Sequence, residues 1–159
     1  MHPSIAHAVQ IQSVNTNLFT RALEGVGEEE ARRRPEGHGN PLLWIAGHLV
    51  TTRSILARVV GVDREIPWGG VFARGAEVRM SAALPSLAEI RTQWDEISRV
   101  LMERLEQLGE AELAAPAGQF PSLDQTVRGA LAMAALHDSY HVGQLGYVRR
   151  LLGRDRLVG

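Results

Sequence analysis

Cysteine is absent from this chain of 159 residues. Its absence excludes disulfide bonds, thiolate metal ligands and a cysteine nucleophile. Any metal ion must therefore be held by histidine, carboxylate or water. Lysine is absent as well, and the 17 arginines are interspersed with 18 acidic residues. Proteins that bind nucleic acid gather their basic residues on one face, so we expect no nucleic acid partner.

Long apolar runs are also missing. No stretch approaches the ~18 uninterrupted apolar residues of a transmembrane helix, and M-H-P-S-I-A-H-A lacks the basic and apolar regions of a signal peptide. We therefore expect no membrane association and a cytoplasmic location. The length and the net charge of -1 fit one soluble domain that spans residues 1–159.

The sustained alternation of β-strands is missing too, whereas four segments repeat apolar residues at the helical period. The chain is therefore predicted to be all-α. The first helix is expected over 3–24 through Ile5, Val9, Val14, Leu18 and Ala22; the others begin at Asn40-Pro41, at Ser86, and at Ser122 with a capping box to Gln125, and end near 60, 108 and 151. The run Glu28–Arg34 is expected on a solvated turn.

The connection 61–85 is too long for a simple turn inside a compact domain. It contains Trp68 and Phe72 on a glycine-rich backbone and could cross the whole molecule. We therefore predict a four-helix bundle with up-down-down-up topology and a long crossover between helices 2 and 3.

Two histidines lie four residues apart in A-L-H-D-S-Y-H-V-G-Q-L-G-Y, residues 135–147. In heptad steps they share an inward line with Val127, Ala130, Ala134, Gln144, Val148 and Leu151. A lone inward histidine is usually a hydrogen-bonded core residue. Two on adjacent turns lie within about 6 Å and can share one ion, so we favour a metal held by His137 and His141.

A third ligand is expected at the same depth on a neighbouring helix. His48 is the best candidate because it lies beside the apolar stripe of the second helix, and Gly47 permits close approach. His38 lies in a loop and is weaker, and His2 and His7 are expected at the surface. The resemblance to the protease motif H-E-x-x-H is judged accidental, since Asp138 replaces glutamate and no sheet is predicted. A ferritin-like di-iron site lacks its Glu-x-x-His pairs.

With these residues the chain resembles the DinB-like family. Its H-x-x-x-H-x-G-Q motif is matched by His137, His141, Gly143 and Gln144, and its upstream histidine followed by leucine is matched by His48-Leu49. The resemblance implies an up-down-down-up bundle, a divalent metal on three histidines and frequently a homodimer. Characterised members include thiol transferases that use bacillithiol and an isomerase that uses mycothiol; others are described as metal-dependent hydrolases.

An ion on three histidines would keep open positions and could acidify either a water or a thiol. Zinc or nickel is expected first, with manganese or iron as alternatives. The substrate is expected to be a small molecule, with a low-molecular-weight thiol as one candidate. The competing hypothesis is a non-catalytic metal-binding or dimeric scaffold, such as a stress-response bundle.

No residue is assigned to catalysis. Candidates for the pocket or for support of the ligands are Trp44, Thr52, Trp68, Tyr140 and Gln144, and ordinary packing is the alternative for each. Trp68 and Phe72 could form a lid. Asp138 is equally compatible with solvent exposure and with support of a histidine. Arg53, Arg149 and Arg150 are compatible with either an anionic substrate or solvent.

Overall fold

A computed structural model describes residues 1–35, 39–73, 75 and 84–158. Its helices are the 3-10 helix η1 (Pro3–Ile5) and the α-helices α1 (Ala6–Leu23), α2 (Glu28–Arg32), α3 (Leu42–Val59), α4 (Leu87–Leu105), α5 (Glu110–Leu113) and α6 (Val127–Leu151). These ranges contain no strand, only an isolated bridge between Pro116 and Thr126. The prediction of an all-α protein is confirmed. Within the same ranges, no helix has the length and apolar content needed to cross a bilayer.

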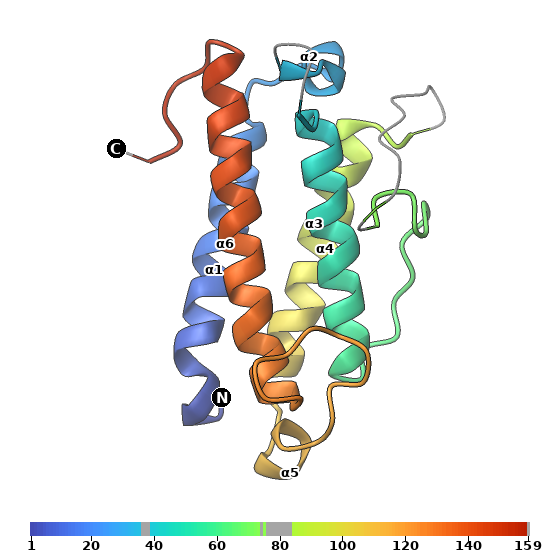
Figure 1. Ribbon diagram of the computed structural model, residues 1–159, viewed down its shortest axis with the longest axis vertical. Coiled ribbons are helices and arrows are strands. Elements are labelled where there is room, and N and C mark those ends of the chain that lie inside the picture. The colour runs from blue at the N-terminus through green and yellow to red at the C-terminus, as the bar shows by residue number, and fades with distance from the viewer. Residues whose placement is uncertain (36–38, 74, 76–83, 159) are drawn as a thin grey trace.

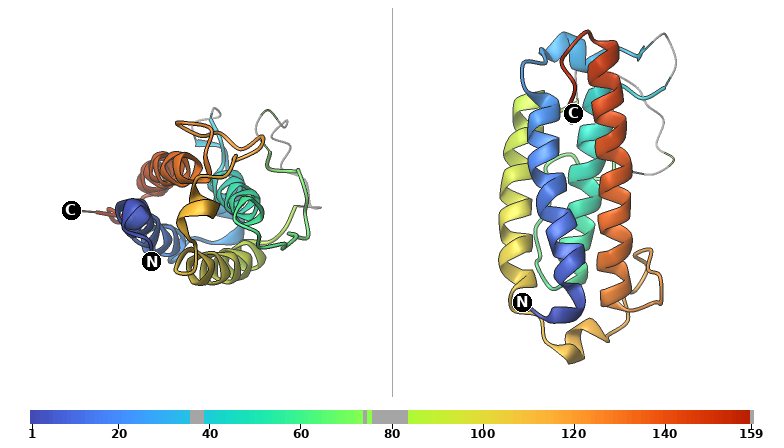
Figure 2. Two further views of the ribbon diagram at one scale, coloured as in Figure 1. Left: turned by 90° about the horizontal axis from the view of Figure 1, so that it is seen from below. Right: turned by 90° about the vertical axis from the view of Figure 1, so that its left-hand side faces the viewer.

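The long helices α1, α3, α4 and α6 lie side by side and form a bundle (Figure 1). Viewed end-on, they stand at the four corners of the molecule (Figure 2). Residues 60–73 leave the end of α3 and run back along its outer side (Figure 1). This segment is the first part of the connection for which a crossover was predicted, and it is called the crossover below.

Two of the predicted helix starts were inaccurate. Pro41 is the N-cap residue of α3, so Asn40 does not cap it. The proposed capping box of Ser122 and Gln125 is wrong, because α6 begins only at Val127 and Thr126 accepts the capping hydrogen bond from the Gly129 amide. Gln125 has a φ of 67° and therefore cannot continue a right-handed helix.

The start of α4 follows the prediction. The Ser86 hydroxyl accepts a hydrogen bond from the Glu89 amide, and the Glu89 carboxylate accepts one from the Ser86 amide at 2.7 Å. This reciprocal capping box satisfies two amides that the helix leaves without partners.

The register predicted for the first helix was also partly wrong. Val14 is 56% exposed, whereas Gln12, Asn15 and Phe19 are buried. Asn15 faces inward because its amide donates to the Ala135 carbonyl at 3.2 Å and to the Ser139 hydroxyl at 3.0 Å, both on α6. A polar contact between helices thus occupies a position where an apolar one was expected.

The expected turn over Glu28–Arg34 contains the short helix α2, which the apolar pattern did not predict. It is bound to the start of α4, because the Leu87 amide donates to the Glu28 carboxylate at 2.7 Å. Arg32 also donates to the carbonyls of Leu84 and Pro85. The segment therefore closes one end of the bundle.

The helix that carries His48 is unusually well covered. Every residue from Leu42 to Thr51 is buried, so α3 has no exposed side over nearly three turns. The crossover covers its outer side with the fully buried Phe72 and the partly buried Trp68. Elsewhere α3 packs against α4 and α6.

Candidate metal centre

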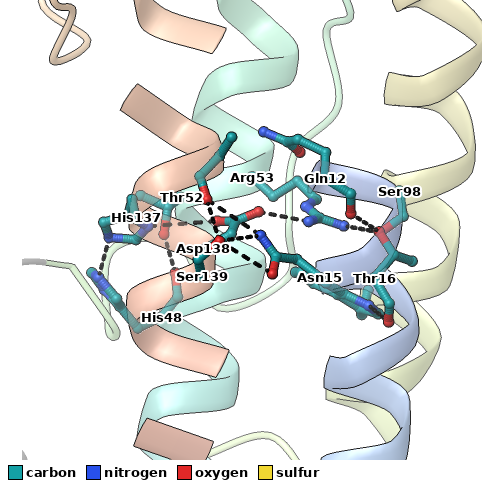
Figure 3. Close-up of polar contacts among 12 residues, drawn as sticks. Gln12, Asn15, Thr16, His48, Thr52, Arg53, Ser98, His137, Asp138 and Ser139 are labelled. Atoms are coloured by element: carbon teal, nitrogen blue, oxygen red, sulfur yellow. Dashed lines mark hydrogen bonds and ion pairs between the residues drawn. The ribbon is translucent and has the colours of Figure 1, made fainter. Parts of the chain in front are cut away.

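The structure brings His48 on α3 together with His137 and His141 on α6. Their ligand nitrogens all lie within 4.8 Å of one another. The Nε2 atoms of His48 and His137 face each other at 3.2 Å (Figure 3). The histidine that was predicted as the third ligand thus lies close to the other two. His38 lies outside the described residues, and His2 caps η1 near the N-terminus.

Each of the three imidazoles has an outer partner at its Nδ1 atom. His48 Nδ1 lies 2.7 Å from the carbonyl oxygen of Phe72, and His141 Nδ1 lies 2.7 Å from Oε1 of Gln144. Both oxygens are acceptors, so each Nδ1 must carry the proton and each neutral ring keeps its lone pair on Nε2. His137 Nδ1 lies 3.5 Å from Oδ1 of Asp138. This arrangement aims Nε2 of each ring at the shared space.

Burial favours the neutral, metal-binding form of these rings. It lowers the pKa of His48, and it lowers the pKa of His141 to about 4 together with the neighbouring His137. Two Nε2 lone pairs that face each other at 3.2 Å repel unless a proton or a cation lies between them. Three neutral imidazoles suit zinc or nickel, so the residues present fit the expected ion.

The orientation of His48 depends on a glycine. A Cβ atom at Gly47 would lie 2.5 Å from two ring atoms of Phe72, so only glycine lets this ring rest on α3. Gly47 was expected to permit close approach of a helix, but its neighbour is the crossover. The crossover thereby supplies the carbonyl oxygen that holds His48.

The residues proposed for the pocket fall into two groups. Trp44 stacks on His48 with 5.0 Å between ring centroids, and Gln144 Nε2 donates at 3.1 Å to the hydroxyl of Tyr140, whose ring edge meets His141. By contrast, Thr52 donates to the His48 carbonyl within α3, and Trp68 contacts Phe72 and donates to Thr51 at 3.4 Å. The first group borders the histidines, and the second serves packing.

Asp138 and Arg53 form a buried ion pair that was not predicted. Arg53 Nη2 donates to Asp138 Oδ2 at 2.6 Å, and both residues are only 2% exposed. Burial by itself would raise the pKa of Asp138, but the Arg53 charge and the hydrogen bonds from His137 and Arg53 together outweigh it and hold that pKa below its usual value. The carboxylate is therefore ionised. Solvent exposure had been considered for Asp138, and solvent or an anionic substrate for Arg53. The structure contradicts these alternatives, because the two buried side chains face each other.

The sequence contained a signal for this pair. The buried side of α6 runs through Leu131, Ala134, Ala135, Asp138, Val142 and Leu145. Asp138 lies at its centre, whereas the His137 side chain, on the predicted inward line, is 28% exposed. His137 and His141 are partly exposed and thus lie at the border of the core.

A cavity of about 260 Å³ opens between α1 and α4, at the far end of the polar cluster around Arg53. Thr16 and Ser98, which accept hydrogen bonds from Arg53, line it, but none of the three histidines does. The cavity is therefore separate from the metal centre.

Comparison with known families matches residues 13–145 to the DinB superfamily. Among curated proteins there is no match. The matched region contains most of α1, all of α3 and α4, and α6 from its start to Leu145, so it contains the whole histidine cluster. This chain is therefore a member of the DinB superfamily.

Proposed function

We propose that the protein binds one divalent metal ion through Nε2 of His48, His137 and His141 and acts as a metal-dependent enzyme on a small molecule. The observation that carries the proposal is the convergence of these rings with Nδ1 of two of them held by acceptors. Metal binding is frequent among DinB-like proteins, which supports it. Zinc or nickel fits three imidazoles best, ahead of manganese or iron.

When bound, the ion would supply Lewis acidity at positions that three protein ligands leave open. The chain's own residues prepare this site: Phe72 and Gln144 fix the orientation of two ligands, and Trp44 packs against one of them. Tyr140 is 62% exposed beside His141 and offers a hydroxyl to an incoming molecule. We propose a thiol-dependent transfer or a hydrolysis, with a low-molecular-weight thiol as one candidate substrate.

Metal content tests the proposal directly. Protein purified without chelator or a nickel column should contain about one divalent ion per chain, measured by elemental analysis. His137→Ala should lose the ion, whereas His7→Ala removes an exposed histidine of α1 and should keep it. Wild-type stoichiometry near zero would contradict metal binding. Turnover is then assayed with thiols plus an electrophile and with ester substrates, using His137→Ala as the blank.

The second candidate is a non-catalytic bundle in which the ion links helices. His48 on α3 and His137 on α6 approach each other across the interface, which favours this alternative. In that case the ion would contribute much of the folding free energy. Removal of the ion distinguishes an enzyme from a scaffold, because only the scaffold should unfold without it.

We also infer an up-down-down-up order for α1, α3, α4 and α6. In support, α3 packs against both α4 and α6, and residues 60–73 run back along α3. A returning connection of this kind is what parallel neighbours α3 and α4 require.

We further propose a homodimer. Large apolar side chains of α1 and α6 are exposed: Ile11, Val14, Leu136, Tyr147 and Leu151. Such surfaces mark interaction sites when they are contiguous. Sedimentation velocity should give twice the chain mass, and a monomer at micromolar concentration would contradict it.

A further inference from the structure

The three outer partners of the histidines differ in charge. His48 faces a backbone carbonyl and His141 faces an amide oxygen, both neutral, whereas His137 faces the ionised carboxylate of Asp138. Of these partners, Asp138 is also the one that is itself anchored by a buried cation. This asymmetry requires an explanation, because the removal of a charge from water costs free energy even when the charge is paired.

We propose that Asp138, clamped by Arg53, is the positioning residue for His137. Its carboxylate orients the ring through Nδ1, keeps Nε2 directed at the ion, and adds one negative charge beside three neutral ligands. The inference rests on the proposed metal binding. It assigns a role to two residues that do not themselves reach the ion.

The geometry supports an electrostatic contact. Oδ1 of Asp138 lies 3.5 Å from His137 Nδ1, longer than an ordinary N–H···O hydrogen bond but close enough for strong attraction at a buried site. Oδ2 is used by Arg53 at 2.6 Å. The two oxygens thus have separate tasks, one toward the cation and one toward the histidine (Figure 3).

Arg53 holds Asp138 in place, and residues of α1 and α4 in turn hold Arg53. Arg53 lies on α3, and its Nη1 donates to the hydroxyls of Thr16 on α1 and Ser98 on α4, each at 2.7 Å. The guanidinium carbon lies 3.6 Å from the ring centroid of Trp94, also on α4. Since the arginine is held on several sides, Asp138 on α6 has little freedom to turn away from His137.

A carboxylate in this position has a known physical effect. It raises the basicity of the ligating imidazole and offsets part of the charge of a divalent ion, and loss of such a partner typically weakens binding by about 10- to 100-fold. The alternative is a purely structural pair that holds the helices together. That alternative predicts changed stability with an unchanged zinc affinity.

The test compares Asp138→Asn with Glu96→Gln, which also removes one carboxylate charge from an ion pair, here with Arg64. Zinc affinity is measured on chelator-stripped protein by competition with a chromogenic chelator. The Nδ1–H proton resonance of His137 is measured by NMR on the zinc-loaded protein. We expect Asp138→Asn to bind zinc about 10- to 100-fold more weakly and to move this resonance upfield, with Glu96→Gln like wild type.

Asp138→Asn leaves Arg53 buried without its partner and could fail to fold. The double variant Asp138→Asn with Arg53→Met removes both charges, and the same loss of affinity and shift of resonance are expected of it.

Affinity within about twofold of wild type, or weaker binding with an unmoved His137 resonance, would overturn the positioning role. Wild-type protein that binds no zinc would instead overturn the proposed function.

Discussion

At the scale of single residues, a shift of one position along α6 decides what a side chain does. His137 and Asp138 are adjacent, yet the first borders the core and the second lies inside it. Successive residues of a helix point about 100° apart. Alanines at 130, 134 and 135 fit either of the two inward lines, so the apolar pattern alone did not choose between them. The ion pair with Arg53 decides the register.

The buried imidazoles predict a pH dependence of stability. Because the pKa of His141 falls to about 4 on folding, the unfolded chain, with a pKa of about 6.5, takes up protons first as the pH drops. Metal-stripped protein should therefore lose thermal stability from about pH 6.5 down to about 4. The lowered pKa of His48 acts in the same direction.

Melting curves at pH 7, 6 and 5, followed by circular dichroism, measure this effect. His141→Gln should show a shallower fall than wild type. An identical slope in the two proteins would show that His141 does not contribute.

Gln12 predicts a stabilising substitution. It is 1% exposed, and neither amide atom has a hydrogen-bond partner within the described ranges. Because burial of unpaired polar atoms costs roughly 1–3 kcal/mol, Gln12→Met should raise the free energy of unfolding by about 1–2 kcal/mol in denaturant titrations. The exposed Gln10 gives the control, and Gln10→Met should change little. A less stable Gln12→Met would refute the argument.

At the scale of elements, the crossover is part of the site. Gly47→Ala would normally strengthen a helix by about 1 kcal/mol. Here the added Cβ lies 2.5 Å from the Phe72 ring, which is fully buried and worth about 3 kcal/mol or more in packing. Displacement of Phe72 should dominate, so the variant is expected to be less stable and to bind zinc more weakly, since His48 loses its acceptor.

Gly143→Ala is the matched control for Gly47→Ala. Gly143 also lies in a helix, but a Cβ added there meets nothing within 4 Å. Thermal melts and zinc titrations of both variants should therefore diverge: Gly143→Ala gains stability and keeps its affinity. Equal stability and zinc affinity of the two variants would show that the Phe72 ring can move aside without loss of stability.

The sequence predicted the elements with strong local signals and missed those without them. The capping box at Ser86 and the apolar stripe of α4 agree, so that helix was placed well. The start of α6 was misplaced because Asp124 accepts hydrogen bonds from Thr126 and forms a turn that competes with the helix. The helices α2 and α5 span only 5 and 4 residues, too few to show a period.

For the site, the spacing of His137 and His141 predicted that they share a helix face, because i and i+4 positions lie side by side. His48 was added from its place beside the apolar stripe of the second helix. The outer partners were harder to predict. Phe72 acts through its backbone carbonyl, which carries no sequence signature, and Arg53 reaches Asp138 across 85 positions. Gln144, three residues from His141, and Asp138, next to His137, were within reach of local reasoning, although solvent exposure was left open for Asp138.

At the scale of the whole molecule, the hydrophobic core is built without the metal centre. Two apolar clusters join residues of α1, α3, α4 and α6, and their side chains pack against one another without any contact to an ion. Removal of the ion should therefore leave the bundle folded. At a free ion concentration of 100 times Kd, binding would add about 2.7 kcal/mol of stability, so chelation should lower Tm but preserve the helical circular dichroism. Unfolding on chelation would favour the scaffold alternative.

The complete burial of residues 42–51 bears on how freely the sequence can drift over evolution. The helix α4 has one buried stripe, so its exposed positions can accept many residue types without loss of fitness. Over the first half of α3, each position touches the core, a neighbouring helix or the crossover. Neutral change there is confined to swaps of similar volume, and divergence of function has to come through the crossover and the exposed border of α6.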